Sequence, residues 1–501
     1  SFRIIQMKDK LFEWYPIGRD MLLSEMIETV LLQINSSRKS TRGITSSIKK
    51  KEKQVATHLL NALYLSYFSI PKMAVAIKMT AKSYSRDTYG YKNVRKVIDA
   101  LDALFFINIK KGSEYSGKVT RVWASHKLEK RFEDLGFKWR YYPPDRTKEI
   151  IIVRDRVLNK DKKNKRKKHT KITVPTPKTK LITIQKENLF RMNEFLSKHC
   201  IALDLRNKDL ITIQEEMKVE ERASKSHFFW EEKPIHALNF SLVHLRRIYS
   251  RGVTYLGGRF YGGWWQSLPS RYRPHITIDG YKTVEVDYST MSLRLLYAKE
   301  GIKIAEKQDL YDIGLKGSKK YLARARELIK IYINALLNDE SGRYRLKPSE
   351  LEELKLSHKE LKDLVRKFHQ PIVHLFGTGV GLELMYLDSM IADELMLFFR
   401  MEGIVLLPIH DSFIIRAGYE LSLRVEMKII FKRLMDSYIL VKSKFSKPRE
   451  YFNKSIPPHL SKGRIIPARE LWDLVIGDTG NKYYSTYYNA WMKWRDEKNI
   501  I

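Results

Sequence analysis

The chain has 501 residues, of which 93 are Lys or Arg and 57 are Asp or Glu, so its formal net charge is 93 − 57 = +36. Hydrophobic residues make up 43%, which excludes a wholly disordered protein. The single cysteine, Cys200, excludes an intrachain disulfide and a cysteine-based zinc site. No apolar run reaches the about 18 residues of a transmembrane helix and no secretory signal opens the chain, so we expect a cytoplasmic protein.

The excess positive charge is concentrated near the N-terminus. Residues 1–180 contain 41 basic and 17 acidic side chains, a net charge of 41 − 17 = +24. Because basic side chains that neutralise phosphates release counterions, this distribution predicts a polyanionic partner, and nucleic acid is the simplest one. A solvated, lysine-rich surface is the alternative. An anionic membrane would need an amphipathic segment with a lipid-facing stripe, and the sequence contains no clear one.

Residues 1–153 are expected to form a small basic domain. Apolar spacing predicts helices over 54–68 and 91–107, with a second apolar-periodic stretch at 73–84 between them. Two β-type stretches and a turn follow at 105–125, which predicts a hairpin. Three helices and a hairpin resemble a winged helix, a family in which the third helix enters the major groove and the hairpin touches phosphate. A helical domain with an exposed basic face is the alternative.

The candidate DNA-binding residues of this module are basic or polar and lie on the third helix or on the hairpin. They are Lys92, Asn93, Arg95, Lys96, Lys110, Lys111, Lys118 and Arg121. Residues 154–182 are expected to be a basic flexible linker and the main domain boundary. Ten of the 22 residues at 159–180 are Lys or Arg and two are Pro, a composition that cannot bury apolar area.

Two segments place a carboxylate where a predicted strand ends. At 283–298 (TVEVDYSTMSLRLLYA), alternating residues predict a strand that ends near Asp287 and leads into a helix. At 403–417 (GIVLLPIHDSFIIRA), two apolar runs predict a hairpin with Asp411 at its tip. An unpaired charge inside an apolar strand is too costly, so each Asp must meet a cation, a donor or water. Alone, either acid could simply cap a turn.

If the strand and the hairpin are neighbours, Asp287 and Asp411 converge, and divalent cations would relieve the repulsion between them. Hard Mg²⁺ prefers carboxylate and phosphate oxygens, and we expect that Mn²⁺ can substitute. Two ions about 3.5–4 Å apart activate a 3′-hydroxyl and stabilise the leaving pyrophosphate. The two acids therefore predict a two-metal centre for nucleotidyl transfer.

These segments resemble motifs of the family A (DNA polymerase I-like) polymerases. Motif A of that family runs Asp-Tyr-Ser-x-x-Glu-x-Arg, and motif C contains a His-Asp pair. The matching residues are Asp287, Tyr288, Ser289, Arg294, His410 and Asp411. Similar elements accompany them at Gly258, Arg259, Gln266 and Pro269, at Asp309-Leu310-Tyr311, and at Arg326 and Lys330 of a helix that resembles motif B. The order A, B, C is that of the family, over residues 240–420.

The resemblance implies an α+β right-hand polymerase fold preceded by the winged-helix-like domain. The implied regions are a thumb-like 183–255, a palm at 256–300 and 371–450, fingers at 301–370, and an aromatic closing element at 451–501. It implies that Asp287 and Asp411 are catalytic and hold two Mg²⁺ ions, with the backbone carbonyl of Tyr288 as a further ligand. The implied primer or template contacts are Arg259, Gln266 and His410, and the implied nucleotide contacts are Arg326, Lys330, Asn334 and Ser292.

The chain departs from the family pattern at three places. Ser292 replaces the motif A Glu that blocks a ribose 2′-hydroxyl, and phage-type single-subunit RNA polymerases also have a small residue there. Those relatives also share the His-Asp-Ser that ends here at Ser412, so both departures favour ribonucleotide tolerance. In motif B, Asn334 and Asn338 replace the aromatic residues, so the base-stacking platform is absent or comes from another residue such as Tyr332.

Three functions follow from these patterns. The first is a DNA-dependent DNA polymerase that uses a primer–template duplex and dNTPs, without a 3′–5′ exonuclease because the N-terminal acids are scattered. The second is an RNA polymerase or primase of the phage single-subunit type, which uses NTPs. The third is a DNA-binding replication initiator with an inert polymerase-like domain. A nucleoid, phage or mobile-element replication setting suits each of them.

Overall fold

A computed structural model of the chain describes residues 23–38, 45–68, 74–77, 79, 90–112, 120–136, 144, 146, 149–160, 167–205, 209, 212–213, 216, 240, 242–444 and 482–497. The fold is mixed α+β. Two separate hydrophobic cores form, one from residues between 23 and 132 and a larger one from residues between 151 and 491. Within the described ranges, no helix is both long and apolar enough to cross a membrane.

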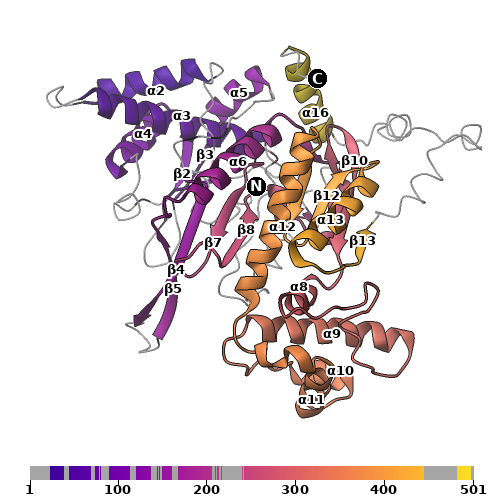
Figure 1. Cartoon of the computed structure of the whole chain (residues 1–501). Coiled ribbons are helices and arrows are strands. Elements are labelled where there is room, and N and C mark those ends of the chain that lie inside the picture. The colour runs from indigo at the N-terminus through magenta and orange to yellow at the C-terminus, as the bar shows by residue number, and fades with distance from the viewer. Residues whose placement is uncertain are drawn as a thin grey trace, which may run out of the picture.

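The N-terminal body packs four helices on a three-stranded sheet of order β1-β3-β2 (Figure 1). Its elements are α2 (Ser24–Ser36), α3 (Ser46–Phe68), β1 (Val75–Ile77), α4 (Tyr91–Ala103), β2 (Ile107–Lys110), β3 (Thr120–Ala124) and α5 (His126–Leu135). In α4, Val94, Val97 and Leu101 follow the helical period and are fully buried. Of the apolar stretch at 73–84, the structure describes only 74–77 and 79; there β1 pairs with β3, and its β-branched residues are buried.

The segment expected to be a linker contains two strands instead. β4 (Ile151–Lys160) pairs with all of β5 (Lys167–Val174) through its residues 153–160, and β4 also pairs in parallel with β7 (Arg246–Tyr249) over 151–153. With β8 (Gly257–Tyr261) they form a sheet of order β5-β4-β7-β8. Ile151 and Val153 are fully buried in the larger core. These two residues directly precede the expected linker, whereas Val157, Leu158 and Ile172 within it are exposed, so its strands are held by backbone pairing.

The central sheet of the larger body has the order β11-β12-β10-β9-β6, and β13 also pairs with β10. Its strands are β6 (Ile201–Leu203), β9 (Ile276–Ile278), β10 (Tyr281–Tyr288), β11 (Leu406–Ile409), β12 (Ser412–Arg416) and β13 (Val441–Lys444). The associated helices are α6 (Lys180–Ser197), α8 (Met291–Lys299), α12 (Gly381–Met401), α13 (Glu420–Met435) and the short η3 (Trp264–Ser267) and η4 (Ser270–His275).

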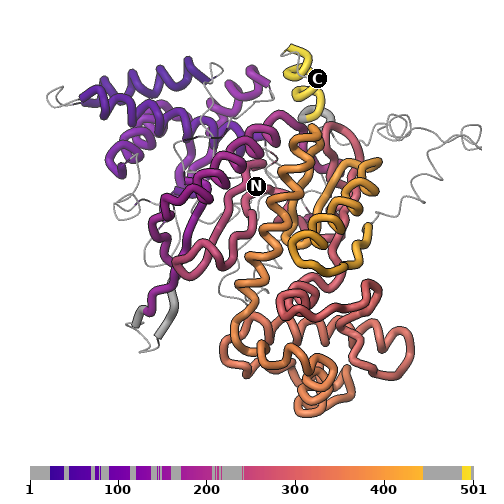
Figure 2. The backbone as a smooth tube through the Cα atoms, in the orientation of Figure 1, coloured from indigo at the N-terminus to yellow at the C-terminus, as the bar shows by residue number. Residues whose placement is uncertain are grey.

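A helical unit lies apart from this sheet, at the foot of the view in Figure 1. It consists of α9 (Lys319–Asn338), α10 (Pro348–Leu354), α11 (His358–Phe368) and η5 (Gln370–Leu375). Figure 2 shows α12 carrying the chain from this unit back along the larger body. At the other end, α16 (Lys482–Glu497) packs near β6, where buried Trp491 donates its indole N–H to the carbonyl of Lys198 at 3.1 Å.

Helix α12 is fixed to β7 and β8 by the buried guanidinium of Arg247, which is 1% exposed. It donates to the Asp393 carboxylate at 2.6 Å, to the Ser389 hydroxyl at 3.0 Å and to the Gly258 carbonyl at 2.8 Å. Gly258 has φ +84°, and a Cβ there would lie 2.7 Å from the Tyr249 ring. The close approach of α12 to β8 therefore depends on a glycine and on one satisfied buried cation.

We predict that Arg247→Met lowers the free energy of unfolding by about 2–4 kcal/mol, because it leaves Asp393 without its cation in a largely buried place. The shift of the urea midpoint of the full chain measures this. Arg433→Met is the matched control, since its exposed pair with the neighbouring Glu394 is expected to contribute less than about 1 kcal/mol. Equal shifts in the two variants would contradict the assignment.

Candidate active site

The two predicted acids lie side by side on the central sheet. β10 and β12 pair antiparallel, with Asp287 directly opposite Ser412, the residue after Asp411. The backbone N–H of Tyr288 donates to the backbone carbonyl of Asp411 at 3.3 Å. Both aspartates are half-buried at the end of the sheet. The β11–β12 turn that carries Asp411 also holds His410 at φ +53°, a conformation that non-glycine residues seldom adopt.

Two side chains of η3 donate hydrogen bonds to the backbone of β11 just before this turn. Trp265 donates its indole N–H, and Gln266 its amide N–H, to the carbonyl of Pro408, each at 3.1 Å. The Gln266 amide also donates to the Phe260 carbonyl at 2.9 Å and accepts from the Gly262 N–H at 2.9 Å. The side chain of Gln266, which we expected to contact the primer or template, is therefore hydrogen-bonded to the backbone next to the hairpin.

Ser412 and Tyr288 have structural partners that bear on their expected roles. The Ser412 hydroxyl donates to the carboxylate of Glu285 at 2.9 Å, which also accepts from Arg273 at 3.0 Å. This buried contact explains a serine after Asp411 without reference to the sugar of a nucleotide. The Tyr288 ring is 3% exposed and its hydroxyl donates to the Met427 carbonyl at 2.8 Å, so only its backbone carbonyl could serve as a ligand.

Arg259 approaches the same acids from β8, but a carboxylate on α12 holds it. Its Nε donates to both Asp388 oxygens, at 3.1 and 2.9 Å, and Asp388 is 4% exposed. Burial raises the pKa of Asp388 to about 6, against the lowering effect of Arg259, and the nearby charge of Asp411 raises it further. Sequence reasoning missed Asp388. The only signal was an acid on the apolar face of α12.

His410 completes this side of the site. Its ring packs against Tyr261 at a centroid distance of 5.6 Å. Burial, followed by the charges of Arg259 and Arg273, lowers its pKa to about 3. The imidazole is therefore neutral at neutral pH, able to donate or accept a hydrogen bond but carrying no charge for a phosphate.

On the other side, the helical unit presents the residues expected to bind nucleotide. Arg326 of α9 pairs with Asp309, and its Nη2 donates at 3.1 Å. The Tyr311 hydroxyl donates to Asn334 at 3.5 Å, and burial followed by the charge of Asp411 raises its pKa, so the aromatic ring lies near the aspartates. Lys330 is exposed on the same helix, one turn after Arg326. Ser292 is half-buried in the first turn of α8.

The loop that leads to Asp309 is ordered by Arg294, the arginine of the motif A pattern. This side chain is 2% exposed and donates to the carbonyls of Ala305, Glu306 and Gln308 at 2.8–2.9 Å. It also reaches the Tyr438 carbonyl before β13, at 3.3 Å. Arg294 is therefore a positioning residue that joins the two loops flanking the site.

A cation that sequence reasoning missed lies on β13. Lys442 is directly opposite Asp287, on the side away from β12, and it is exposed. Cross-strand partners project to the same face of a sheet, so Lys442 and Asp287 share a face. Burial raises the pKa of Asp309, but its contacts with Arg326 and Tyr311, and then the charge of Lys442, lower it below its usual value. The sequence of β13, VKSK, contains a second lysine and a serine, so nothing in it singled out Lys442.

The donor set of the two acids suits Mg²⁺ and excludes softer metals. Two carboxylates and one backbone carbonyl are hard oxygen ligands. Over the part of the chain that the structure describes, no group of three or more His, Cys, Asp or Glu side chains converges. A metal held here would thus depend on its nucleotide and water ligands as well as on the protein.

The DNA-binding candidates of the N-terminal body are mostly exposed. On α4, Lys92, Arg95 and Lys96 are exposed, but Lys96 donates to buried Glu52 at 3.1 Å and Arg95 lies 3.8 Å from Asp99. Asn93 is half-buried. On the hairpin, Lys110 and Lys111 are exposed, Arg121 is half-buried, and Lys118 lies outside the described residues. Lys96 thus has a structural partner within the fold.

No protein-family model matches the chain, and no curated protein matches it. Among solved structures, it is similar to the POL domain of Pol1 from M. smegmatis, in a complex with DNA primer-template and dNTP. The TM-score is 0.32 at 12% sequence identity, over 52% of this chain and 69% of that chain. A likeness of this size does not establish a family for the chain.

Acid is predicted to destabilise the larger body through its buried histidines. The pKa of His410 is about 3, and burial lowers that of His369 to about 4. Both lie below the unfolded value near 6.5, so the unfolded state binds more protons as the pH falls from about 6.5 to 4. At pH 5, each histidine should cost about 2 kcal/mol by linkage.

Urea midpoints at pH 7.5 and pH 5.0 measure this loss. His369→Gln is expected to remove about half of the combined histidine effect, because the glutamine does not titrate. His374→Gln, which replaces an exposed histidine, is the control for the substitution itself and is measured at the same two pH values. Identical pH profiles for His369→Gln and the unchanged chain would contradict the assigned shift.

Proposed function

We propose that the chain is a template-directed nucleotidyltransferase, a DNA-dependent DNA polymerase of family A type that acts through two Mg²⁺ ions and lacks proofreading. The observation that carries the proposal is the placement of Asp287 next to Asp411, on adjacent strands from distant parts of the sequence. Two hard carboxylates at the end of the sheet, with Arg259 and Lys442 near them, suit a reaction in which phosphate charge is neutralised.

Each protein group has a role in this proposal. Asp287, Asp411 and the Tyr288 carbonyl would hold the ions, which activate the 3′-hydroxyl and stabilise pyrophosphate when bound. Arg326 and Lys330, one turn apart on α9, would bind the triphosphate of an incoming nucleotide. Neutral His410 would donate a hydrogen bond to the primer terminus. Arg259 would reach the primer only in competition with Asp388.

The N-terminal body would bind duplex DNA as a winged helix. Its support is the exposed basic side of α4, followed in sequence by the β2–β3 hairpin. Lys92, Lys110 and Lys111 are its exposed basic candidates. A small polymerase with its own DNA-binding module suits a phage or mobile-element setting.

An RNA polymerase or primase is the second candidate, and Ser292 favours it. A serine in the first turn of α8 leaves room that the family glutamate would fill. Ser412 gives this candidate no support, because its hydroxyl is engaged by Glu285. Product analysis with NTPs, with and without a primer, separates the two candidates.

We predict that Asp287→Ala and Asp411→Ala each lower Mg²⁺-dependent primer extension by at least about 10³-fold, since metal charge stabilisation contributes several kcal/mol and 1.36 kcal/mol is tenfold. Extension of a labelled primer on a DNA template measures the rate. Asp363→Ala, at an exposed acid of α11, is the control and should retain full activity. Undiminished extension by either active-site variant would overturn the proposal.

Sugar discrimination tests the role of Ser292. Ser292→Glu is expected to raise the preference for dNTPs over NTPs by at least about tenfold, because the longer side chain collides with a 2′-hydroxyl. The ratio of kcat/KM values for matched dNTP and NTP measures it, with Ser292→Gln as a control for size without charge. Strict use of dNTPs by the unchanged chain would contradict the assigned tolerance.

A further inference from the structure

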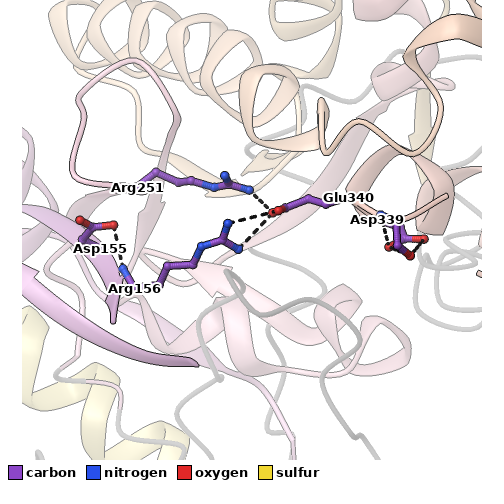
Figure 3. A network of polar contacts seen from close by, with 6 residues as sticks. Asp155, Arg156, Arg251, Asp339 and Glu340 are labelled. Atoms are coloured by element: carbon purple, nitrogen blue, oxygen red, sulfur yellow. Dashed lines mark hydrogen bonds and ion pairs between the residues drawn. The ribbon is translucent and has the colours of Figure 1, made fainter. Parts of the chain in front are cut away.

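Two arginines from the β5-β4-β7-β8 sheet converge on one carboxylate of the helical unit (Figure 3). Arg156 of β4 donates two hydrogen bonds to the Glu340 carboxylate, at 3.3 and 3.2 Å. Arg251, in the β7–β8 turn, donates to the same group. This junction is a direct link between the sheet and the loop that follows α9.

Two guanidiniums meet the carboxylate of Glu340 at the junction, and Asp155 is a second acid close by. Two guanidiniums share one carboxylate, and their side chains stay 29% and 30% exposed. Burial, and then repulsion from Arg156, lower the pKa of Arg251, while Asp155 only partly opposes this. The nearby Asp155 accepts from the Arg156 backbone N–H at 2.8 Å. The two guanidiniums are therefore close to one another and remain partly open to solvent.

Both sides of the junction are preorganised by backbone contacts. Arg251 has φ +58°, and the next residue, Gly252 at φ +72°, donates its N–H to the Arg154 carbonyl at 2.9 Å. On the other side, Asp339 accepts from the N–H groups of Ser341, Arg343 and Tyr344 at 2.9–3.2 Å, which fixes the loop around Glu340. A fixed pair of guanidiniums is a geometry suited to tetrahedral oxyanions.

The strands beside the junction carry further basic residues, of which Arg154 and Lys171 have described side chains. Beyond Val153, β4 pairs only with β5, so the two strands form an arm that projects from the sheet (Figure 1). Arg156 lies directly opposite Lys171, and like charges opposite one another are unfavourable. Residues 151–174 contain ten basic and two acidic side chains. Like charges along the arm repel one another, and a bound polyanion would relieve this repulsion.

We propose that Arg156 and Arg251 form a binding site for the phosphodiester backbone of a nucleic acid, and that Glu340 occupies this site when no nucleic acid is bound. The carboxylate takes the place of a phosphate oxygen and ties the helical unit to the arm. Backbone phosphate exchanges with Glu340 and frees the loop after α9. The inference rests on the proposed function only in taking nucleic acid as the partner.

The test relies on opposite signs at the two halves of the junction. Binding of a fluorescent primer–template DNA duplex to the full chain is measured by anisotropy over a series of salt concentrations. Arg156→Ala and Arg251→Ala should each weaken binding by about threefold or more and reduce the salt slope by about 1, because one phosphate contact is lost. Glu340→Gln should strengthen binding by about two- to fivefold, because it removes the carboxylate that competes with phosphate for the two arginines. The effect is small because an exposed ion pair is weak.

A purely structural junction would give a different pattern, with Glu340→Gln weakening binding as the arginine variants do, or leaving it unchanged. Either result overturns the inference. Arg324→Ala and Glu353→Gln are matched controls, since this exposed pair within the helical unit also has bidentate geometry and should not affect binding. Urea midpoints of all variants establish that they are folded.

Failure of this inference is distinguishable from failure of the proposed function. If both arginine variants bind DNA unchanged while extension still requires Asp287, the phosphate site is absent and the polymerase proposal stands. If Asp287→Ala still extends primers, the polymerase proposal fails, and the signs of the binding changes still decide the phosphate site.

Discussion

The antiparallel register of β10 with β12 is the constraint on which the rest of the site depends. It sets Asp287 opposite Ser412 and brings it next to Asp411. Two carboxylates do not approach one another without compensation, because their repulsion is strong in a partly buried place. Two surrounding cations supply compensation: Arg259 on β8, which interacts with Asp411, and Lys442 on β13, directly opposite Asp287.

Buried ion pairs also fix β7 and β8 against helix α12. Arg247 and Arg259 reach α12 through Asp393 and Asp388, five residues apart on one helix. Since α12 is also the connection from the helical unit, the same contacts set where α9 stands relative to the sheet. Burying such pairs contributes little net stability compared with apolar residues. Their value here is positional, because an unpaired member would be costly and alternative packings are thereby disfavoured.

Local patterns predicted the strand and the hairpin that carry Asp287 and Asp411, because alternation and apolar runs are short-range signals. Asp388 was not predictable, since its partner Arg259 is distant in the sequence and only the fold brings them together. Charge density concealed β4, which pairs with β5 over 153–160 and with the distant strand β7 over 151–153. Likewise, the residue type of Gln266 indicated a polar contact but not which one.

The arginines expected to bind phosphate share one property that the net charge of the chain does not reveal. Arg259, Arg326 and Arg156 each already pair with a carboxylate, on Asp388, Asp309 and Glu340. Binding of a polyanion at such sites is an exchange of partners, and each exchange returns less free energy than neutralising a free cation. A single phosphate therefore gains little at any one of them. A nucleic acid carries many phosphates on one chain, so it can displace several of these carboxylates together. The total gain in binding free energy is then larger. The high net charge can thus coexist with selectivity for long, regularly spaced anions.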